Sequence, residues 1–381
     1  MRIAVEIQPV LEEYLTGVGE YTDNLIKRLK YHADKNDEIY LLGMDFFRKA
    51  GRVMGYQAPN ITVRTNGLMH YGIYRRLWNY MPFIDYGRFF GVKADIFHFV
   101  NFVIPPYVKG KAVVTVYDMV YRRFPETMER ANLKKLEKNL ADSCARADAV
   151  ITISQSSKRE IIEYLGVPDE KVHIIYPGVD TDRYHSGIDR DMIDGILKKY
   201  ALPDAYFLYL GTLEPRKNIE TIVEAYRLYN KNHGGDIRLV IAGKKGWQYE
   251  RIFEKVREYG LEQRIIFPGY VSEEDKPGLY AGARAFLFPS LYEGFGMPPL
   301  EAMACGTPVI AAAASSLPEV MGDAGCMVEP MDTEAIAGYM HALASDREFS
   351  DSIRARGFDR AKKFSWDKSV EALFRVYREL I

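Results

Sequence analysis

The chain has 381 residues, of which 48% are hydrophobic and 27% are charged, and its formal net charge is −1. This length favours two domains with separate cores, and the balanced charge excludes a strongly basic nucleic-acid binder. No apolar run approaches the roughly 18 residues that a membrane-spanning helix needs.

Apolar runs alternate with amphipathic stretches, a pattern typical of parallel sheets covered by helices. In the first half, strands are predicted at residues 3–7, 39–42, 61–64, 96–99, 112–116, 149–153 and 172–175. Helices are predicted there at residues 21–31, 133–144 and 156–164. The fold class expected is therefore α/β, with a first Rossmann-like domain over residues 1–185.

The second half repeats the alternation after a polar, Asp-rich stretch at residues 178–204. Strands are predicted at residues 206–210, 238–242, 265–267, 285–288 and 309–312, and helices at 218–232, 248–259, 272–281 and 298–304. A second Rossmann-like domain is therefore expected over residues 186–364. Residues 365–381 form an amphipathic pattern, and this last helix should pack on the first domain.

Two carboxylates eight residues apart, Glu293 and Glu301, flank a turn rich in glycine and proline. The turn follows a predicted buried strand and precedes a helix with proline in its first turn, a position where open α/β sheets bind ligands. Gly294 and Gly296 permit close backbone approach and expose N–H donors. Because carboxylates accept hydrogen bonds from hydroxyls, the segment predicts a site for a polyol that carries phosphate, such as a nucleotide sugar.

The predicted strand 206–210 is followed by a segment that begins with Gly211 and Thr212 and contains two adjacent cations, Arg216 and Lys217. Two positive charges at a strand-to-helix turn can neutralise a diphosphate, and each charge pair at 4 Å contributes on the order of 4 kcal/mol before desolvation. Arginine adds a bidentate fork for phosphate. The alternative is a solvated Arg-Lys pair, which the Glu293–Glu301 segment downstream disfavours.

A second glycine-rich loop, with Gly17 and Gly19, leads into the first predicted helix. It lacks the third glycine of a dinucleotide fingerprint, because Thr22 stands at that position, and it starts too far beyond the first strand. The loop could present N–H groups to a phosphate or a sugar. A helix-start turn is an equally good interpretation.

His98 and Asp118 stand near the ends of two successive predicted strands, where acceptor-side chemistry should lie in such a fold. For His98 the alternative is a satisfied core histidine. For Asp118 it is a carboxylate that caps a helix or turn.

Asp180 and Asp182 form a DxD triplet, a pattern that holds a divalent metal in some glycosyltransferases. The triplet lies at the head of the expected linker, where Asp favours turns, and we expect no metal site and metal-independent activity. Cys144, Cys305 and Cys326 are scattered, which predicts buried thiols in a reducing compartment. With a strand predicted at Ile3 and no signal peptide visible, a cytoplasmic location is expected.

Residues 48–93 hold basic residues in excess of the single acidic residue, Asp85, with aromatic residues interleaved. The basic residues are Arg48, Lys49, Arg52, Arg64, Arg75, Arg76, Arg88 and Lys93. The aromatic residues are Tyr71, Tyr74, Trp78, Tyr80, Phe83, Tyr86, Phe89 and Phe90. This composition suits peripheral contact with an anionic membrane or a lipid-diphosphate acceptor, and equally a core helix with a solvated charged side.

The combination of these motifs resembles the group 1 retaining glycosyltransferases, family 4, with the GT-B fold. The residues that carry the resemblance are Glu293-Gly294-Phe295-Gly296, the run from Glu301 to Ile310, Ser316-Leu317-Pro318-Glu319, the Gly17/Gly19 loop, Ser154, Pro177-Gly178-Val179-Asp180, Arg216-Lys217 and Phe364-Ser365-Trp366. It covers nearly the whole chain. It implies two parallel-sheet domains that face a deep cleft, the first binding the acceptor and the second the nucleotide-sugar donor.

The resemblance also implies roles for the residues of the two motifs. Glu293 would bind hydroxyls of the donor sugar, Glu301 the ribose, and Arg216 with Lys217 the departing diphosphate. Further donor-binding residues implied are Gly17, Gly19, Gly211, Thr212, Gly294, Phe295, Gly296 and Met297, with Gly269, Tyr270 and Val271 near the base. His98 and Asp118 would join the catalytic set, and the reaction would retain anomeric configuration without a covalent intermediate.

Two positions depart from the family pattern. Many members have Arg directly after the glycine of the phosphate loop, where this chain has Thr212, and Arg216 would substitute. Many also have His-Asp where this chain has Tyr117-Asp118. The Gly-Thr-Leu-Glu-Pro-Arg-Lys-Asn form resembles mannosyltransferase-like members and favours GDP-mannose as donor, with no separate cofactor.

Other functions remain open at this point. A UDP-sugar donor is the first alternative, and a sugar-nucleotide epimerase or a glycoside phosphorylase on the same fold is the second. A non-catalytic nucleotide-sugar-binding protein is the third. The expected partners are a nucleotide sugar and a glycan or lipid-linked acceptor.

Overall fold

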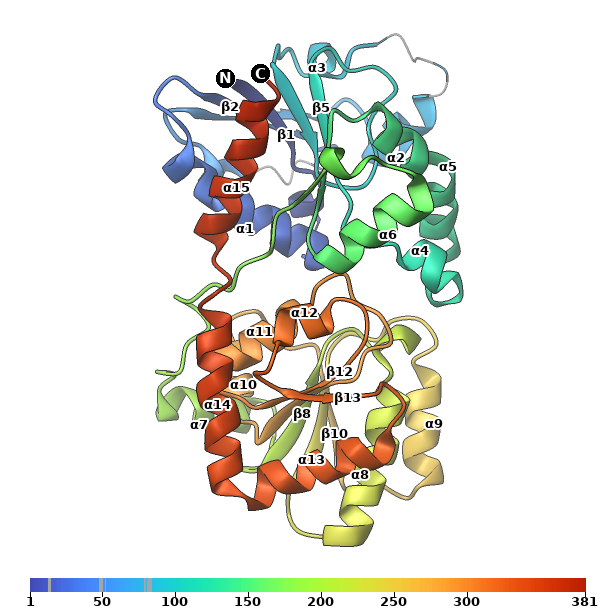
Figure 1. Ribbon diagram of the computed structural model, residues 1–381, viewed down its shortest axis with the longest axis vertical. Helices are drawn as coiled ribbons and strands as arrows, with labels where there is room; N and C mark the ends of the chain where they lie inside the picture. Colours follow the sequence, from blue (N-terminus) through green and yellow to red (C-terminus); the bar gives the residue numbers. More distant parts are fainter. Residues whose placement is uncertain (13–14, 48–50, 52, 79, 81–83) are drawn as a thin grey trace. The chain divides into compact units, whose positions relative to one another are not determined.

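The computed structural model describes residues 1–12, 15–47, 51, 53–78, 80 and 84–381. Arg48, Lys49, Arg52 and Phe83 of the basic and aromatic segment lie outside the described residues. The chain forms two compact units (Figure 1). Unit 1 comprises Met1–Arg123, Arg130–Gly178 and Trp366–Ile381, and unit 2 comprises Phe124–Glu129 and Val179–Ser365.

Unit 1 contains a seven-stranded parallel sheet with the strand order β3-β2-β1-β4-β5-β6-β7. Its strands are β1 (Arg2–Glu6), β2 (Glu38–Met44), β3 (Ile61–Asn66), β4 (Ile96–Phe99), β5 (Lys111–Thr115), β6 (Ala149–Thr152) and β7 (Val172–Ile174). Strands β4 and β6 are buried along their whole length, as expected for a parallel sheet covered on both faces.

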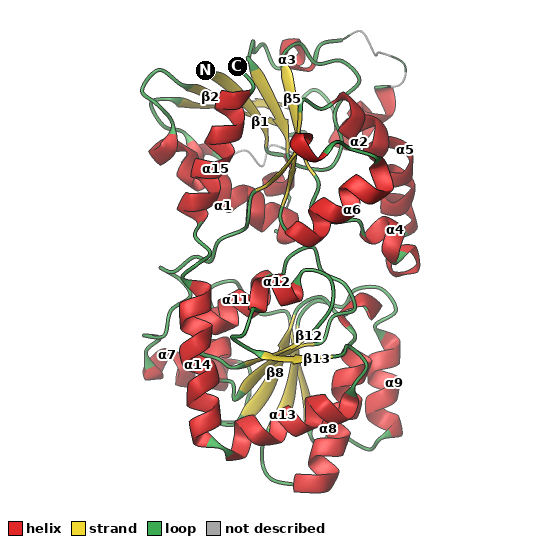
Figure 2. Ribbon diagram, in the orientation of Figure 1, coloured by secondary structure: helices red, strands yellow, loops and turns green. Residues whose placement is uncertain are grey.

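Helices flank the sheet of unit 1 (Figure 2). They are α1 (Gly17–His32), α2 (Tyr71–Leu77), α3 (Tyr86–Phe89), α4 (Val120–Arg123), α5 (Arg130–Arg146), α6 (Gln155–Leu165) and α15 (Trp366–Glu379), with short 3-10 turns η1 (Gln8–Leu11), η3 (Met54–Tyr56) and η5 (Asp169–Lys171). The last helix, α15, packs against α1, where the Trp366 and Tyr21 rings meet at 5.5 Å between centroids. The prediction that the C-terminal helix returns to the first domain is confirmed.

Unit 2 contains a six-stranded parallel sheet with the strand order β10-β9-β8-β11-β12-β13. Its strands are β8 (Tyr206–Leu210), β9 (Arg238–Ala242), β10 (Ile265–Gly269), β11 (Ala285–Phe288), β12 (Val309–Ala312) and β13 (Cys326–Val328). Its helices are α7 (Arg190–Lys199), α8 (Ile219–His233), α9 (Glu250–Glu258), α10 (Lys276–Gly282), α11 (Met297–Ala304), α12 (Leu317–Met321), α13 (Thr333–Ser345) and α14 (Arg347–Ala361), with 3-10 turns η4 (Pro125–Thr127) and η6 (Pro215–Lys217). Both units are thus Rossmann-like, as predicted.

One helix lies where the sequence suggested a linker. The Asp189 side chain accepts a hydrogen bond from the backbone N–H of Asp191 and so caps α7. Ile193 and Ile196 of this helix are buried, and a Cβ added to Gly278 of α10 would lie 2.3 Å from Ile196 Cδ1. Helix α7 is therefore a packed part of unit 2 rather than a connection.

The three cysteines are buried and free, as predicted. Within the described part of the chain, no helix combines the length and the apolar character needed to cross a bilayer.

Candidate active site

Three glycines stand beside one another at the carboxyl edge of the sheet in unit 2: Gly211 follows β8, Gly243 follows β9, and Gly269 is the last residue of β10. The Gly211 N–H donates to Ala242 O at 3.0 Å, and the Gly243 N–H donates to Gly269 O at 2.8 Å. Gly243 has φ +143°, and a Cβ there would lie 1.8 Å from Gly211 O. The loops are therefore packed backbone against backbone, which requires glycine at position 243. The sequence predictions did not include Gly243, although it directly follows the predicted strand 238–242.

The cation loop is tied to the loop after β11 by main-chain and side-chain hydrogen bonds. Asn218 follows η6 with φ 57°, and its side-chain amide donates to Pro289 O at 3.0 Å. The Leu291 N–H donates to Arg216 O at 2.9 Å, and Arg216 Nη1 donates to Tyr292 O at 2.7 Å. These bonds fix the cations beside the segment that begins with Glu293.

The two predicted motifs meet in one ion cluster. Lys217 Nζ lies 2.6 Å from Glu293 Oε1, and Arg216 Nη1 lies 3.1 Å from Glu293 Oε2. The other end of the guanidinium, Arg216 Nη2, lies 2.6 Å from Glu214 Oε1. The Lys217 ammonium also lies 5.2 Å from the centroid of the Phe288 ring. The interpretation of Arg216 and Lys217 as a solvated pair is wrong, because their side chains are only 19% and 14% exposed.

The charge state of Glu293 follows from these neighbours. Burial alone would raise its pKa, but Lys217 and then Arg216 oppose that effect and lower the pKa to about 2. Glu293 is therefore an anion throughout the physiological pH range, able to accept hydrogen bonds but not to donate a proton.

Two serines, Ser315 and Ser316, form hydrogen bonds with the backbone of Glu293 and of the glycine-rich turn that follows it. The Glu293 N–H donates to Ser315 Oγ at 2.8 Å, and Ser316 Oγ lies within hydrogen-bond distance of Glu293 O (2.8 Å) and of Phe295 O (2.7 Å). Gly296 has φ +123° and precedes the first residue of α11, Met297. The turn is thus a fixed structure at a helix N-terminus, where backbone N–H groups favour anions.

Glu301, on α11, is the second carboxylate of the motif and is 7% exposed. The Tyr280 hydroxyl donates to its Oε2 at 3.0 Å. Burial raises the pKa of Glu301, and Lys276 partly offsets that rise. Lys276 is itself held at 2.6 Å by Glu273. Neither Tyr280 nor Lys276 was among the predicted site residues, because both belong to α10, outside either motif.

The remaining predicted donor residues of unit 2 lie at the same edge of its sheet or next to it. Thr212 O accepts a hydrogen bond from the Tyr209 hydroxyl at 3.0 Å. Val271 is buried, whereas Tyr270 is 45% exposed, with the Lys244 ammonium 4.8 Å from its ring centroid.

The predicted site residues Gly17, Gly19, His98 and Asp118 belong to unit 1. His98 is 1% exposed, and its ring nitrogens lie 2.7 Å from the Tyr377 hydroxyl and 2.7 Å from Thr115 Oγ1. Burial lowers the pKa of His98 to about 3, so the ring is neutral.

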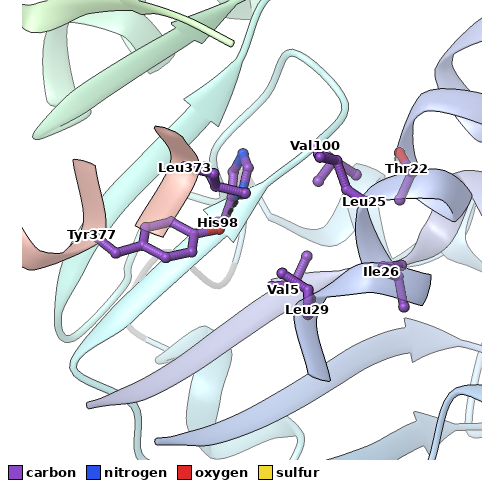
Figure 3. A pocket seen from close by; sticks show the side chains of 9 residues that line it. All are labelled: Val5, Thr22, Leu25, Ile26, Leu29, His98, Val100, Leu373 and Tyr377. Atoms are coloured by element: carbon purple, nitrogen blue, oxygen red, sulfur yellow. Dashed lines mark hydrogen bonds between the residues drawn. The ribbon is translucent and has the colours of Figure 1, made fainter. Parts of the chain in front are cut away.

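The His98 ring faces a small, largely apolar cavity between α1, α15 and the sheet (Figure 3). The cavity is lined by Val5, Thr22, Leu25, Ile26, Leu29, His98, Val100, Leu373 and Tyr377. Because both ring nitrogens have protein partners, the geometry favours the core histidine, one of the two alternatives that the sequence left open.

Asp118 and the Gly17/Gly19 loop also have local structural roles. Asp118 Oδ1 accepts a hydrogen bond from the Val120 N–H at 3.1 Å, at the start of α4. A Cβ added to Gly19 would lie 3.1 Å from Pro9 O, so Gly19 lets α1 approach η1 closely. These contacts match the capping and helix-start interpretations.

The DxD triplet forms a turn in which Tyr184 N–H donates to Asp180 O at 2.7 Å. Among the residues that the structure describes, no group of three or more His, Cys, Asp or Glu side chains is placed to hold a metal ion.

Comparison with protein-family models gives two matches that together span most of the chain. Residues 196–360 match glycosyl transferases group 1, and residues 15–183 match Glycosyltransferase Family 4. The chain is 31% identical over 396 aligned residues to O-antigen chain mannosyltransferase B of Escherichia coli, with 100% of both proteins covered. It is 34% identical to the serotype-specific mannosyltransferase WbdA of Escherichia coli over 66% of this chain and 31% of that protein.

Solved structures share the fold of the whole chain. Anabaena HepE in complex with UDP and glucose matches with a TM-score of 0.74 at 19% identity, covering 100% of both chains. WaaG, a glycosyltransferase involved in lipopolysaccharide biosynthesis, matches with a TM-score of 0.68 at 14% identity, covering 98% of this chain and 99% of that one. Together with the full-length relative, these matches confirm the predicted fold and enzyme class: the chain belongs to the group 1, family 4 glycosyltransferases, has the GT-B fold and is an enzyme of the hexosyltransferase type.

Proposed function

We propose that the protein transfers a mannosyl group from GDP-mannose to a hydroxyl of a glycan or lipid-linked acceptor, with retention of anomeric configuration and without a metal ion. The observation that carries the proposal is the cluster of Lys217 and Arg216 on Glu293 at the carboxyl edge of the sheet in unit 2. Mannose is favoured because the relatives that match at 31% and 34% identity are both named mannosyltransferases.

Each group of the cluster has a task in this reaction. The acceptor oxygen attacks the anomeric carbon of the donor while the bond from that carbon to the phosphate oxygen breaks, and the acceptor proton passes to the leaving phosphate. Arg216 and Lys217 stabilise the charge that develops on the departing diphosphate. Glu293, ionised because of its two cationic neighbours, accepts hydrogen bonds from the sugar hydroxyls.

The rest of the donor lies along the same edge of the sheet in this proposal. The N–H groups of Phe295 and Gly296 bind the sugar or the phosphate at the N-terminus of α11. Glu301 accepts hydrogen bonds from the ribose hydroxyls. The backbone from Gly269 to Val271 holds the base, and unit 1 holds the acceptor.

Nucleotide binding tests the donor assignment. Thermal unfolding of the full-length protein is measured with GDP, UDP and ADP at equal concentrations, because stabilisation grows with the ratio of concentration to dissociation constant. GDP should raise Tm by several degrees more than UDP or ADP. A larger shift with UDP would favour the alternative donor, a UDP-sugar, and no shift with any nucleotide would contradict the proposal.

Turnover then tests the reaction class. GDP-mannose should be consumed only when an acceptor glycan is present, and the product linkage should have the anomeric configuration of the donor. Activity should persist in excess EDTA, because the cation pair supplies the positive charge that a metal would otherwise provide. Exchange of solvent deuterium into the donor sugar without acceptor would instead indicate an epimerase, and a requirement for inorganic phosphate would indicate a phosphorylase.

We also propose that the protein works in the cytoplasm, in peripheral contact with an anionic membrane surface. Large apolar side chains are exposed between β2 and α3. They lie in or next to the basic and aromatic segment of residues 48–93. The exposed apolar residues are Phe46, Phe47, Met54, Leu68, Ile73 and Tyr80. Flotation with vesicles that contain anionic lipid should carry the protein at low salt, whereas neutral vesicles should not; no flotation with anionic vesicles would refute this contact.

A further inference from the structure

A charged cluster lies at the carboxyl end of β1 in unit 1. Glu6 is the last residue of β1 and is 4% exposed. Strand β1 has β2 on one side and β4 on the other. The chain runs outward from β1 through β2 to β3 and then returns to β4, so the strand order reverses at β1. Such a reversal leaves a crevice outside the carboxyl ends of the strands, where α/β proteins bind ligands.

Two polar atoms of opposite charge in this cluster have no partner. The Tyr71 hydroxyl, on α2, donates to Glu6 Oε1 at 2.9 Å. Glu6 Oε2 is buried without a hydrogen bond, and so is Arg75 Nε, one turn further along α2. A buried polar atom without a partner destabilises a fold, and native proteins satisfy nearly all such atoms. Two of them in one cluster therefore indicate a ligand that supplies the missing partners.

The charges around Glu6 balance one another. Lys135 of α5 and Arg75 of α2 are the cations, and Glu6 and Glu12 are the anions that interact with Lys135. Burial lowers the pKa of Lys135 to about 8, and Arg75 acts in the same direction, while Glu6 and Glu12 oppose the fall. With two cations against two carboxylates, the cluster has no excess charge for an anionic ligand. It favours a neutral ligand that offers both hydrogen-bond donors and acceptors.

We infer that Glu6, Arg75 and Lys135 bind a neutral pyranose of the acceptor, one of whose hydroxyls donates to Glu6 Oε2. Arg75 and Lys135 donate to oxygens of the same sugar. Only the description of this sugar as the acceptor rests on the proposed function. The binding of a neutral pyranose by these three side chains is a separate claim and can be tested on its own.

Saturation-transfer NMR of the full-length protein with methyl α-D-mannopyranoside tests the inference. Glu6→Gln keeps the shape of the side chain but removes the charge-assisted hydrogen bond, and Lys135→Met removes a donor while keeping most of the apolar stem. Each variant should bind the sugar at least about tenfold more weakly than the wild type. Glu163→Gln, on an exposed position of α6, is the matched control and should leave binding unchanged. Mannose 6-phosphate should bind no tighter than the neutral sugar.

A parallel measurement keeps the outcomes distinct. The rise in Tm that GDP causes should be the same in Glu6→Gln, Lys135→Met and the wild type, which establishes that the variants fold and that the donor residues are intact. Wild-type affinity for the sugar in both variants, or no saturation transfer to the wild type, would overturn the inference. If the wild type bound the sugar but did not bind GDP, the proposed function would be contradicted while the inference would stand.

Discussion

Neutralising Glu293 should strengthen the binding of a nucleotide diphosphate while it impairs sugar transfer. In the structure, the carboxylate of Glu293 engages both cations that the proposal assigns to the diphosphate, at 2.6 Å from Lys217 and 3.1 Å from Arg216. Glu293→Gln removes this competing charge without changing the shape of the side chain. The same change weakens the contact with the donor sugar, because an amide accepts hydrogen bonds less strongly than a carboxylate.

The size of the effect follows from the pKa of Glu293. The pKa falls from 4.5 to about 2 despite burial, and this difference corresponds to about 3 kcal/mol of net stabilisation of the anion by its surroundings. If about 1.4 kcal/mol of that interaction becomes available to the phosphates, GDP should bind about tenfold more tightly to Glu293→Gln. Loss of the charge-assisted bond to the sugar should lower kcat/KM for GDP-mannose by about a hundredfold.

Calorimetric titration with GDP and initial-rate kinetics with GDP-mannose measure the two effects on one preparation. Glu214→Gln is the matched variant, because Glu214 pairs with Arg216 at 2.6 Å but the proposal gives it no contact with the sugar. It should increase GDP affinity by a smaller factor and keep its turnover. Weaker GDP binding by Glu293→Gln would refute the reasoning, and so would unchanged turnover.

Two further predictions concern the stability of the scaffold. Gly243→Ala should lower the free energy of unfolding by about 3 kcal/mol or more, because its Cβ would collide with Gly211 O at 1.8 Å. The control is Gly338→Ala in α13, where nothing lies within 4 Å of the added Cβ, and it should raise the free energy of unfolding by about 0.5–1 kcal/mol. Equal urea midpoints for the two variants would contradict the loop contact. Burial lowers the pKa of His98 from 6.5 to about 3, so between these two pH values only the unfolded chain takes up this proton. The stability that the neutral ring contributes is therefore present above pH 6.5 and is lost as the pH falls towards 3. The free energy of unfolding should decrease by up to about 1.4 kcal/mol per pH unit in this range. Urea unfolding at pH 6.5 and pH 5 should show a larger loss for the wild type than for His98→Asn, and equal losses would exclude a buried neutral imidazole.

The sheets could be predicted from the sequence because their strands are continuous apolar runs. Residues 206–210, 238–242, 285–288 and 309–312 have the predicted bounds in the structure. Strand β13 (Cys326–Val328) was not predicted, although β7, which is equally short, was. Helix α7 escaped because the Asp-rich stretch around it was interpreted as a linker, although Met192, Ile193, Ile196 and Leu197 repeat at helical spacing.

The two motifs of the site could be predicted from the sequence, but the ion pair between them could not. Placement after a strand located Glu293 and Lys217 at one edge of the sheet, whereas the ion pair between them depends on side-chain directions that spacing does not encode. Glu6 was not predicted, although it lies in the predicted strand 3–7, since its partners come from α2 and α5, far away in the sequence. His98 was correctly placed on a strand, but only the structure shows that Tyr377 and Thr115 occupy its two nitrogens.

The central claim is that Arg216 and Lys217 hold the diphosphate of the donor, and Lys217→Met tests it most directly when GDP and guanosine are compared by calorimetric titration. Removing one cation should weaken GDP binding by roughly two to three orders of magnitude, since a charge pair at 4 Å contributes on the order of 4 kcal/mol at an effective dielectric constant of 20. Guanosine, which carries no phosphate, should bind both proteins equally. Wild-type affinity of Lys217→Met for GDP would contradict the account, and so would an equal loss of affinity for GDP and for guanosine.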